Sequence, residues 1–334
     1  MTIKDIARES GCAIGTVSRV LNNHPDVSEE TRKKVLEVVN KYDFVLNTNA
    51  KQLKQQERNT IVIIVKGTSS ILLNSLLEKI QKKIESMPYT ASVVVIDELD
   101  NEAKVANRIY YEQKPIGMIF LGGSPDYFEE DYLKTKIPSV IISTETMGVD
   151  NSNLSSVSTN NFEACEYSAS YLIENGHKKI GVVGGDFQSS GLTQIRYAGF
   201  LSAMEKAGIS FDKEKQYASA KYTLEGGAEA TKELLKKFPD VTAIFTMADV
   251  MAMGCIRQLQ DMGIKVPDQI SVIGFDGLTI VDYFCPRITT IKQKDEELVD
   301  VGLKVLIDSI ENKAEPVHKF IPFEFVTGES VKKL

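Results

Sequence analysis

The sequence predicts an N-terminal all-α head followed by an α/β body of parallel sheets flanked by helices and arranged in two lobes. Three observations support this fold class. The first 45 residues contain three short helical patterns, and from Thr60 onward short apolar strands alternate with amphipathic helices, an order typical of parallel sheets. In addition, three strands in the first half of the body have counterparts in the second half, so the body is a weak internal repeat.

The head is predicted from local helix signals. A first helix starts at Thr2, a capping residue with the carboxylate of Asp5 three positions later, and it ends at Gly11. A second helix is expected from about Ala13 to Leu21, and a third helix is capped by Ser28. Three short helices with a glycine turn between the first two match a helix-turn-helix.

The second helix has an apolar face and a face with groups suited to DNA contact. Val17 and Val20 would pack against the first helix. Arginine bonds guanine edges or phosphates, threonine and serine bond phosphates as does the following Asn22, and an exposed isoleucine contacts thymine methyl groups. The alternative is an ordinary helical hairpin with a solvated arginine. The exposed residues are expected to be Ile14, Gly15, Thr16, Ser18 and Arg19.

Charge distinguishes the two parts only weakly. The chain has a formal net charge of −7, with 43% hydrophobic and 25% charged residues, a balance typical of folded domains. Residues 1–58 contain 10 Lys and Arg against 8 Asp and Glu, whereas the remaining residues contain 29 against 38. The basic excess of the head is so small that charge alone proves little about its partner.

The cysteines and the apolar runs exclude several classes of protein. The cysteines are scattered and form no C-x-x-C pair, so neither a metal cluster nor a disulfide framework is expected. No apolar run approaches the roughly 18–20 residues of a membrane span, and the N-terminus lacks the apolar stretch of a signal peptide. We therefore expect a cytoplasmic protein with reduced thiols, without metal, cofactor or membrane partner.

A polar segment, residues 45–59, separates the head from the body. After Val45, only Leu46, Ala50 and Leu53 interrupt its polar residues, so this segment is too polar to pack by itself. The pattern indicates a linker with the capacity to form a helix.

The body is expected to begin with the strand Ile61–Val65, whose continuous β-branched residues are typical of a strand buried on both faces. The later strands are predicted at Ser92–Ile96, Gly117–Leu121, Ser139–Ile142, Lys179–Val183, Ala243–Met247 and Ile270–Phe275. The helices between the strands are predicted at Leu72–Met87, Asn101–Gln113, Asn161–Asn175, Ile195–Ala207, Leu224–Phe238 and Val250–Met262.

Two similar lobes of this kind are expected to enclose a cleft. The repeat pairs Ile61–Val65, Gly117–Leu121 and Ser139–Ile142 with Lys179–Val183, Ala243–Met247 and Ile270–Phe275. Ligands of parallel α/β folds bind beyond the carboxyl ends of the strands, so a small molecule is expected in the crevice between the lobes.

Dense motifs run along the whole chain. In the head they are Thr2-Ile3-x-Asp5-Ile6-Ala7, Thr16-Val17-Ser18-Arg19-Val20-Leu21-Asn22 and Val27-Ser28-x-x-Thr31-Arg32. In the body they include His177-Lys178-Lys179-Ile180, Arg196-x-x-Gly199-Phe200, Asp249-x-Met251-Ala252-x-Gly254 and Ile273-Gly274-Phe275-Asp276. With these motifs the chain resembles the lactose-repressor (LacI/GalR) family of bacterial transcription regulators, which implies a periplasmic-binding-protein-like body.

The resemblance implies how DNA is bound. In the family the linker becomes a hinge helix on the operator, and a leucine at the position of Leu53 wedges into the minor groove, where unstacking a base step costs a few kcal/mol. Asn47 and Lys51 belong to the same hinge. The implied DNA-binding residues are Thr2, Ile14, Gly15, Thr16, Ser18, Arg19, Asn22, Asn47, Lys51 and Leu53.

The resemblance also places an effector in the cleft. Arg196 and Asp276 lie where the family holds its effectors, and a donor beside an acceptor suits a ligand with several hydroxyls. Tyr222 lies where the family often has a stacking aromatic residue. Asp249 either bonds the ligand or caps the helix Val250–Met262. The other implied effector-binding residues are Ser69, Ser70, Leu72, Leu73 and Phe187.

Four departures from the family pattern stand out. Leu46 replaces the usual proline of the hinge, and Lys51 replaces an arginine, whose planar set of donors lysine lacks. In the cleft, Ala248 stands where the family often has asparagine, and Leu72-Leu73 replaces an aromatic pair. The pocket is therefore expected to be more aliphatic than in typical sugar-responsive members.

Together these expectations describe a repressor whose operator binding is controlled by a small molecule, with a sugar or sugar derivative as the expected effector. The head is residues 1–45, the hinge 46–58 and the body 59–334, with an N-lobe of 59–158 and 293–318 and a C-lobe of 159–289 and 322–334. A homodimer of such chains implies a near-palindromic operator.

Three alternatives are kept beside this interpretation. A solute-binding protein shares the two-lobed body but would need neither the helical head nor DNA. A corepressor in place of an inducer would reverse the effect of the ligand. An enzyme is poorly supported, because Gly122-Gly123 and Gly184-Gly185 form neither G-x-G-x-x-G nor a P-loop, and no Ser-His-Asp set is evident.

Overall fold

The structure is a computed structural model that describes residues 2–21, 24–42, 59–67, 70–98, 100–132, 137–146, 153–187 and 191–334. The chain divides into two compact units, Met1–Gln56 and Glu57–Leu334. The proposed hinge lies outside the described residues, so its predicted helix is not addressed by the structure. The predicted site residues that lie outside the described residues are Asn22, Asn47, Lys51, Leu53 and Ser69.

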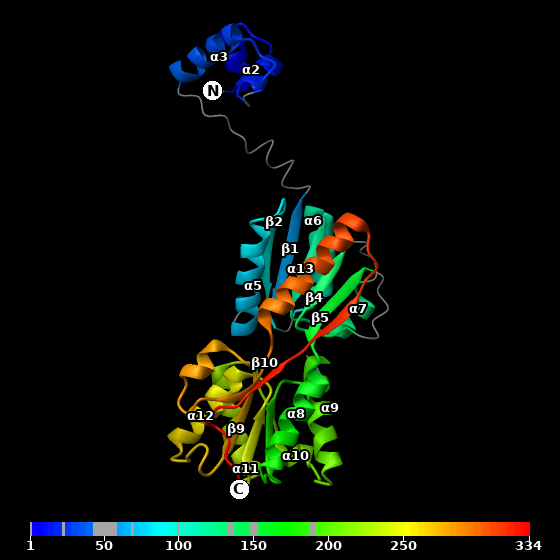
Figure 1. The fold of residues 1–334 in the computed structure, drawn as a ribbon, viewed down its shortest axis with the longest axis vertical. Coiled ribbons are helices and arrows are strands. Elements are labelled where there is room, and N and C mark those ends of the chain that lie inside the picture. The colour runs from blue at the N-terminus through cyan, green and yellow to red at the C-terminus, as the bar shows by residue number, and fades with distance from the viewer. Residues whose placement is uncertain are drawn as a thin grey trace. The chain divides into compact units, whose positions relative to one another are not determined.

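The first unit contains three helices (Figure 1). At the start of α1, the backbone N–H and the hydroxyl of Thr2 both donate to the Asp5 carboxylate at 2.8 Å, as the capping pattern predicts. Gly11 ends α1 at φ +65°, a left-handed conformation that glycine adopts without steric cost. The predicted helix-turn-helix is confirmed. Its helices are α1 (Ile3–Ser10), α2 (Ile14–Leu21) and α3 (Glu29–Lys41).

A small apolar core holds the three helices together. Ile6 from α1, Val17 and Val20 from α2, and Val35 from α3 are each at most 1% exposed. Fully burying an aliphatic side chain of this size stabilises a fold by roughly 1.5–3 kcal/mol. The hydroxyl of Ser28 accepts the backbone N–H of Thr31 at 3.3 Å and so fixes the start of α3.

The second unit begins with a six-stranded sheet in the order β11-β5-β4-β3-β1-β2, in which every neighbouring pair is parallel. Its strands are β1 (Thr60–Lys66), β2 (Thr90–Ile96), β3 (Gly117–Leu121), β4 (Ser139–Ile142), β5 (Leu154–Thr159) and β11 (His318–Ile321). Its helices are α5 (Ile71–Ile84), α6 (Glu102–Gln113), α7 (Pro125–Glu130) and α13 (Asp295–Asn312).

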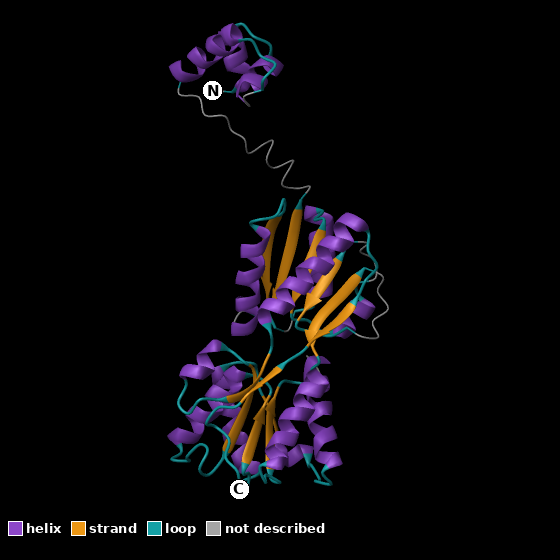
Figure 2. Ribbon diagram, in the orientation of Figure 1, coloured by secondary structure: helices purple, strands orange, loops and turns teal. Residues whose placement is uncertain are grey.

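Helices cover both faces of this sheet (Figure 2). Successive residues of β1 point to opposite layers, as the period of a strand requires. Ile61, Ile63 and Val65 pack with apolar residues of α5 and α13, whereas Val62 and Ile64 pack with those of α6 and α7. All five side chains are at most 1% exposed, which confirms that β1 is buried on both faces.

A second six-stranded sheet has the order β12-β10-β9-β8-β6-β7, and only its edge strand β12 is antiparallel. Its strands are β6 (Ile180–Gly184), β7 (Tyr217–Ser219), β8 (Ala243–Thr246), β9 (Ser271–Asp276), β10 (Thr289–Lys292) and β12 (Glu324–Val326). Its helices are α8 (Asn161–Glu174), α9 (Gly191–Lys206), α10 (Lys213–Gln216), α11 (Leu224–Lys237), α12 (Asp249–Asp261) and the 3-10 helix η1 (Thr279–Tyr283).

The predicted repeat is visible in the order of the strands. Strands β4, β3 and β1 are consecutive neighbours in the first sheet. Their counterparts β9, β8 and β6 occupy the same positions in the second sheet. The chain passes between the two sheets three times: from β5 to α8, from β10 to α13, and from β11 to β12 (Figure 1). Each sheet therefore contains segments that are far apart in the sequence.

Candidate functional site

The outer face of α2 is open to solvent. Ile14 is 47% exposed, Gly15 is exposed, and the side chain of Arg19 is 62% exposed. A Cβ added at Gly15 would meet no atom of the described residues within 4 Å, so none of those residues covers that position. Thr16 and Ser18 are half-buried at the edges of the same face. The predicted side chains therefore lie on one accessible surface.

Thr2 lies at the start of α1, and its side chain is exposed while bonded to Asp5. A helix N-terminus presents backbone N–H groups that bind phosphate well. Thr2 and the residues of α2 belong to one small unit, so they can approach a duplex together. Such a surface offers donors for phosphates, donors for base edges and one apolar side chain.

The second unit has a cavity of about 300 Å³ at the carboxyl ends of strands from both sheets. Lys66 at the end of β1 and Thr144 after β4 belong to its wall, as do Tyr222 after β7 and Asp276 at the end of β9. This volume is at the lower end of the roughly 300–1,000 Å³ of small-molecule sites. The predicted effector-binding residues that line the cavity are Ser70, Leu72, Leu73, Arg196, Tyr222 and Asp276.

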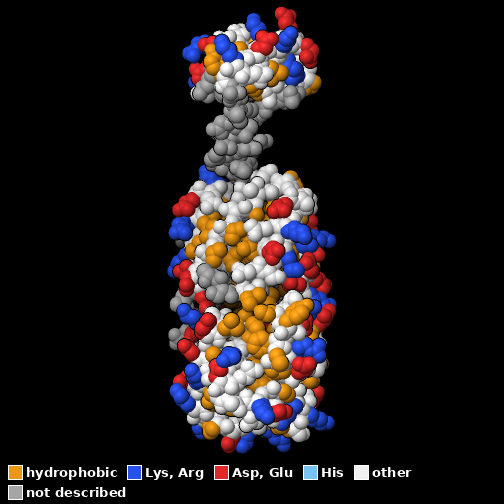
Figure 3. Space-filling view, turned by 90° about the vertical axis from the view of Figure 1, so that its left-hand side faces the viewer, with side chains coloured by type: hydrophobic (Ala, Val, Ile, Leu, Met, Phe, Trp, Pro, Cys, Tyr) orange, Lys and Arg blue, Asp and Glu red, His pale blue; other side chains and the backbone are white. Residues whose placement is uncertain are grey.

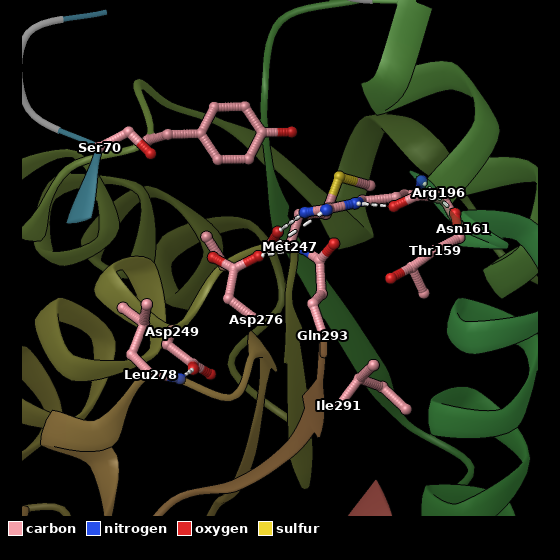
Figure 4. A network of polar contacts seen from close by, with 12 residues as sticks. Ser70, Thr159, Asn161, Arg196, Met247, Asp249, Asp276, Leu278, Ile291 and Gln293 are labelled. Atoms are coloured by element: carbon pink, nitrogen blue, oxygen red, sulfur yellow. Dashed lines mark hydrogen bonds and ion pairs between the residues drawn. The ribbon is translucent and has the colours of Figure 1, made fainter. Parts of the chain in front are cut away.

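Arg196 on α9 is the centre of a polar network in this wall (Figure 4). It is only 3% exposed; its Nε donates to Asn161 Oδ1 at 3.0 Å, and its Nη1 donates to the carbonyl of Met247. Its Nη2 lies 3.8 Å from Asp276 Oδ1, and its guanidinium carbon lies 3.8 Å from the centre of the Phe275 ring. The guanidinium plane is therefore fixed before any ligand arrives.

Asp276 is held beside this arginine at the end of β9. Its φ of +123° is rare for a residue with a side chain, and such backbone costs about 1–3 kcal/mol and clusters at ligand sites. Gln293 Nε2 donates to Asp276 Oδ1 at 2.9 Å (Figure 4). Burial raises the pKa of Asp276, while the charge of Arg196 and the bond from Gln293 oppose that rise. The cavity thus has a fixed donor and a fixed acceptor side by side.

Asp249 has a different role from the two that the sequence predicts. It is fully buried behind the cavity wall, where it accepts from Leu278 N at 2.8 Å and from Thr290 Oγ1 at 2.6 Å. Burial raises the pKa of Asp249 well above its ordinary value, and the carboxyl of Asp276 raises it further. Because Ala248 holds the N-cap position, Asp249 neither caps α12 nor lines the cavity. Instead it ties the first turn of α12 to β10 and to the segment after β9.

Phe187, which the sequence predicts as an effector-binding residue, is not among the residues that line the cavity. Its ring centre is 5.0 Å from that of Tyr197 and 4.9 Å from that of Tyr217, and Lys213 Nζ lies 3.5 Å from it. These contacts place Phe187 in an aromatic cluster beside β7. Tyr222 is the aromatic residue that reaches the cavity, and its hydroxyl is 3.0 Å from Thr193 Oγ1.

Several lining residues have no counterpart among the predicted ones. Lys66 Nζ lies 2.6 Å from Glu102 Oε2, and Glu102 is completely buried, so a charged pair lies behind one wall. Ser143 and Thr144 bring two hydroxyl groups. Thr144 is 1% exposed, and its Oγ1 has no hydrogen-bond partner among the residues that the structure describes. Lys66 ends β1, and Ser143 and Thr144 follow β4, and that position was the signal available in the sequence.

The described ranges contain no group of three or more His, Cys, Asp or Glu side chains placed to hold a metal ion. In the same ranges, no helix combines the length and the apolar character needed to cross a membrane. All four cysteines are free thiols: Cys12, Cys165, Cys255 and Cys285.

Comparison with known protein families supports both units. Residues 2–47 match the family described as bacterial regulatory proteins, lacI family. Residues 169–331 match the periplasmic binding protein-like domain.

Individual proteins match over nearly the whole chain. The HTH-type transcriptional regulator MalR of Clostridium butyricum is 34% identical over 333 residues, which cover 99% of each chain. The lac repressor dimer bound to operator and the anti-inducer ONPF is similar in structure, with a TM-score of 0.80, 22% identity and 99% of each chain covered. A complex of the transcriptional regulator CelR with cellobiose has a TM-score of 0.73, 24% identity and the same coverage. These two structures support the fold.

Proposed function

The chain belongs to the lacI family of bacterial regulatory proteins, and from this premise we propose that it is a repressor released from its operator by a small carbohydrate. As a member of this family it is a DNA-binding transcriptional regulator. The observation that carries the finer proposal is the fixed pair of Arg196 and Asp276 on the wall of the cavity. A donor and an acceptor held 3.8 Å apart suit neighbouring hydroxyl groups on one ligand. No catalytic step is part of the proposal.

The head reads DNA through the exposed face of α2. Arg19 bonds a guanine edge in the major groove, Ile14 contacts a thymine methyl group, and Thr16 and Ser18 bond phosphates. Gly15 lets the backbone approach closely because no side chain stands there. The remaining contacts of the proposal come from Thr2, Asn22, Asn47, Lys51 and Leu53, the last as a minor-groove wedge.

The ligand is expected to lie with its hydroxyls toward Arg196 and Asp276 and its carbon face toward apolar residues. Leu72 and Leu73 from α5 and Tyr222 from the other lobe supply that apolar surface. Further hydroxyl partners are Ser69, Ser70, Ser143 and Thr144. A carbohydrate combines both surfaces on one small molecule, whereas a hydrocarbon would leave the buried polar groups unpaired.

The active form is proposed to be a homodimer. Figure 3 shows hydrophobic side chains gathered along one face of the body, the face on which α5 and α12 lie in Figure 1. Exposed side chains near these elements include Ile71 at 40%, Val95 at 52%, Ile280 at 47% and Tyr283 at 85%. Contiguous apolar surface of this kind marks protein interfaces. A two-fold dimer places two heads on a near-palindromic operator in the cytoplasm.

We propose that the ligand controls DNA binding by changing the relative arrangement of the two lobes. We take the N-lobe as 59–158 with 293–318, and the C-lobe as 159–289 with 322–334. Ligand between the lobes favours one relative arrangement of them, which the two hinges then transmit to the heads. Shifting the population from 1:99 to 99:1 requires about 5.5 kcal/mol of differential binding. An inducer prefers the form that does not bind DNA, and a corepressor prefers the other form.

The test combines ligand and DNA binding on the full chain. The first step is a thermal-shift screen of neutral sugars, sugar phosphates, uronic acids and nucleobases. A neutral or modified sugar should be the stabilising ligand, because a ligand that binds the native state raises the midpoint of thermal unfolding. That sugar should then weaken binding to an operator selected from random duplexes. Absence of any sequence preference for DNA would indicate a solute-binding protein, and tighter binding with the sugar would indicate a corepressor. Arg196→Ala should bind the operator as before and lose the response to the sugar.

A further inference from the structure

The segment 24–28, which precedes α3, is hydrogen-bonded to both neighbouring helices. The backbone N–H of His24 donates to the carbonyl of Arg19 at 2.9 Å, which folds this segment onto the last turn of α2. Arg32 from α3 donates through Nη2 to the carbonyl of His24 at 2.7 Å. The position of His24 beside Arg19 is therefore held by a backbone acceptor of α2 on one side and by the guanidinium donor of Arg32 on the other.

One acidic residue of this segment faces the arginine of the proposed DNA-reading surface. Asp26 Oδ2 lies 3.7 Å from Arg19 Nη1, and the other oxygen, Oδ1, lies 2.6 Å from His24 Nδ1. The bond to His24 lowers the pKa of Asp26, and the charge of Arg19 lowers it slightly further, so the carboxylate is ionised at neutral pH. Both partners of the Arg19 pair are more than half exposed.

We propose that Asp26 determines how selectively the head binds DNA, by orienting the Arg19 guanidinium and by opposing its capture by phosphates. The proposal rests on the proposed role of α2 in reading the major groove. On a duplex without the matching sequence, Arg19 can bind only phosphates, which brings them close to Asp26, and the carboxylate repels them. On the correct site Arg19 turns to a guanine edge instead, so the carboxylate opposes binding less there. Asp26 is a positioning residue in this scheme and needs no base contact of its own.

The strength of the pair fits this role. Exposed ion pairs at such distances are weak and are screened by salt, so a guanine edge displaces Asp26 from Arg19 readily. The bond to His24 and the hydrogen bonds of this segment keep the carboxylate close to the arginine before DNA arrives. A weak but persistent pair changes the ratio of specific to non-specific binding more than it changes the affinity for the correct site.

The experiment uses the full chain and a duplex selected from a random pool by the wild-type protein. Dissociation constants for this duplex and for a shuffled one are measured by fluorescence anisotropy over a range of salt concentrations. Asp26→Asn should bind the shuffled duplex about threefold or more tightly, with a salt dependence steeper by up to about one released ion. Its affinity for the selected duplex should change by less than about twofold, so the specificity ratio falls. Asp26→Glu, which keeps the charge, should restore most of the ratio.

Two controls separate the possible failures. Glu37→Gln makes the same charge change at an exposed position of α3 and should leave the ratio unchanged; a fall equal to that of Asp26→Asn would mean that net charge alone matters, which overturns the proposal. Equal tightening on both duplexes, or no change on either, overturns it as well. Arg19→Ala should abolish preference for the selected duplex. If preference survives in that variant, the assignment of α2 fails first, and the role of Asp26 fails with it.

Discussion

Replacing Arg196 with methionine keeps the volume of the side chain but removes the only cation that faces Asp276 in the described network. The change deletes the bonds to Asn161 and to the Met247 carbonyl, and it leaves the Asp276 carboxylate buried with only uncharged donors, Gln293 and the backbone N–H of Asp249. Breaking a buried ion pair on one side typically costs 3–5 kcal/mol. We expect about 3 kcal/mol at pH 7.5, because Asp276 can take up a proton.

The stability lost in the Arg196→Met variant depends on pH, because the Asp276 carboxylate can bind a proton. The pKa of Asp276 is raised in the folded protein, so the folded state holds the proton more tightly than the unfolded state does. Stability attributable to this group is therefore present at low pH and is lost as pH rises toward the folded pKa. Without Arg196 the pKa rises further. The variant should accordingly lose less stability at pH 5.5 than at pH 7.5, relative to the parent protein at each pH.

The assay is urea unfolding followed by circular dichroism, with thermal unfolding in parallel. For a unit of this size, a loss of about 3 kcal/mol in the free energy of unfolding lowers the midpoint of thermal unfolding by roughly 6–12 °C. The double variant Arg196→Met with Asp276→Asn should be more stable than the sum of the single effects predicts, because no charge is left unpaired. Arg257→Met, which breaks an exposed pair with Asp261 on α12, is the matched control and should cost less than about 1 kcal/mol. A cost for Arg196→Met no larger than that of the control, or no recovery in the double variant, would refute the reasoning.

Three other predictions concern the hinge, a buried histidine and the proposed dimer face. Leu53→Ala should weaken binding to the selected operator more than binding to shuffled DNA in anisotropy titrations; equal losses would remove the wedge role. Burial lowers the pKa of His177, whose Nε2 lies 3.1 Å from the Lys332 carbonyl, so its contribution to stability is complete above about pH 6.5 and is lost as the pH falls below that value. His177→Gln should therefore flatten the decline in urea stability between pH 7 and pH 5.5, and an unchanged decline would contradict this. Tyr283→Asp should shift the protein to monomer in sedimentation velocity, and a dimer of unchanged affinity would place the interface elsewhere.

The head was predictable because its signals are local. Capping by Thr2 and Ser28 and the left-handed glycine at Gly11 each act within one turn of helix, so the sequence contains them directly. The start of α2 was misjudged by one residue, a normal uncertainty at helix ends. The buried contacts of Val17 and Val20 follow from helical spacing alone.

The body was predictable where its strands are central and apolar. The five central residues of β1 and all residues of β3 are buried, and their mostly apolar side chains predict this burial. The strand β5 was missed because its sequence Leu-Ser-Ser-Val-Ser-Thr is mostly hydroxylated, although every residue is buried. The edge strands β7, β11 and β12 are only three or four residues long, which is too short for a periodic signal. α13 has an ordinary amphipathic pattern, with Leu298 and Leu303 buried, and could have been found.

The residues of the candidate site could also be predicted only in part from the sequence. Arg196 and Asp276 were identified by family motif, and both lie on the cavity wall. Sequence could not reveal where Asp249 and Phe187 point, because their directions depend on β10 and β7, which pack against them from distant parts of the chain. The hydroxyl of Thr144 was missed because the sequence does not show which residues of the segment after β4 face the cavity.

The three passages of the chain between the sheets have an evolutionary consequence. Neither lobe is one continuous stretch of gene, since α13 and β11 complete the first sheet only after most of the second has been made. A recombination event with one junction can therefore exchange the head for another, but it cannot transplant a lobe intact. New pairings of an operator preference with a ligand preference can arise by shuffling, whereas a change confined to one lobe must accumulate by point substitution.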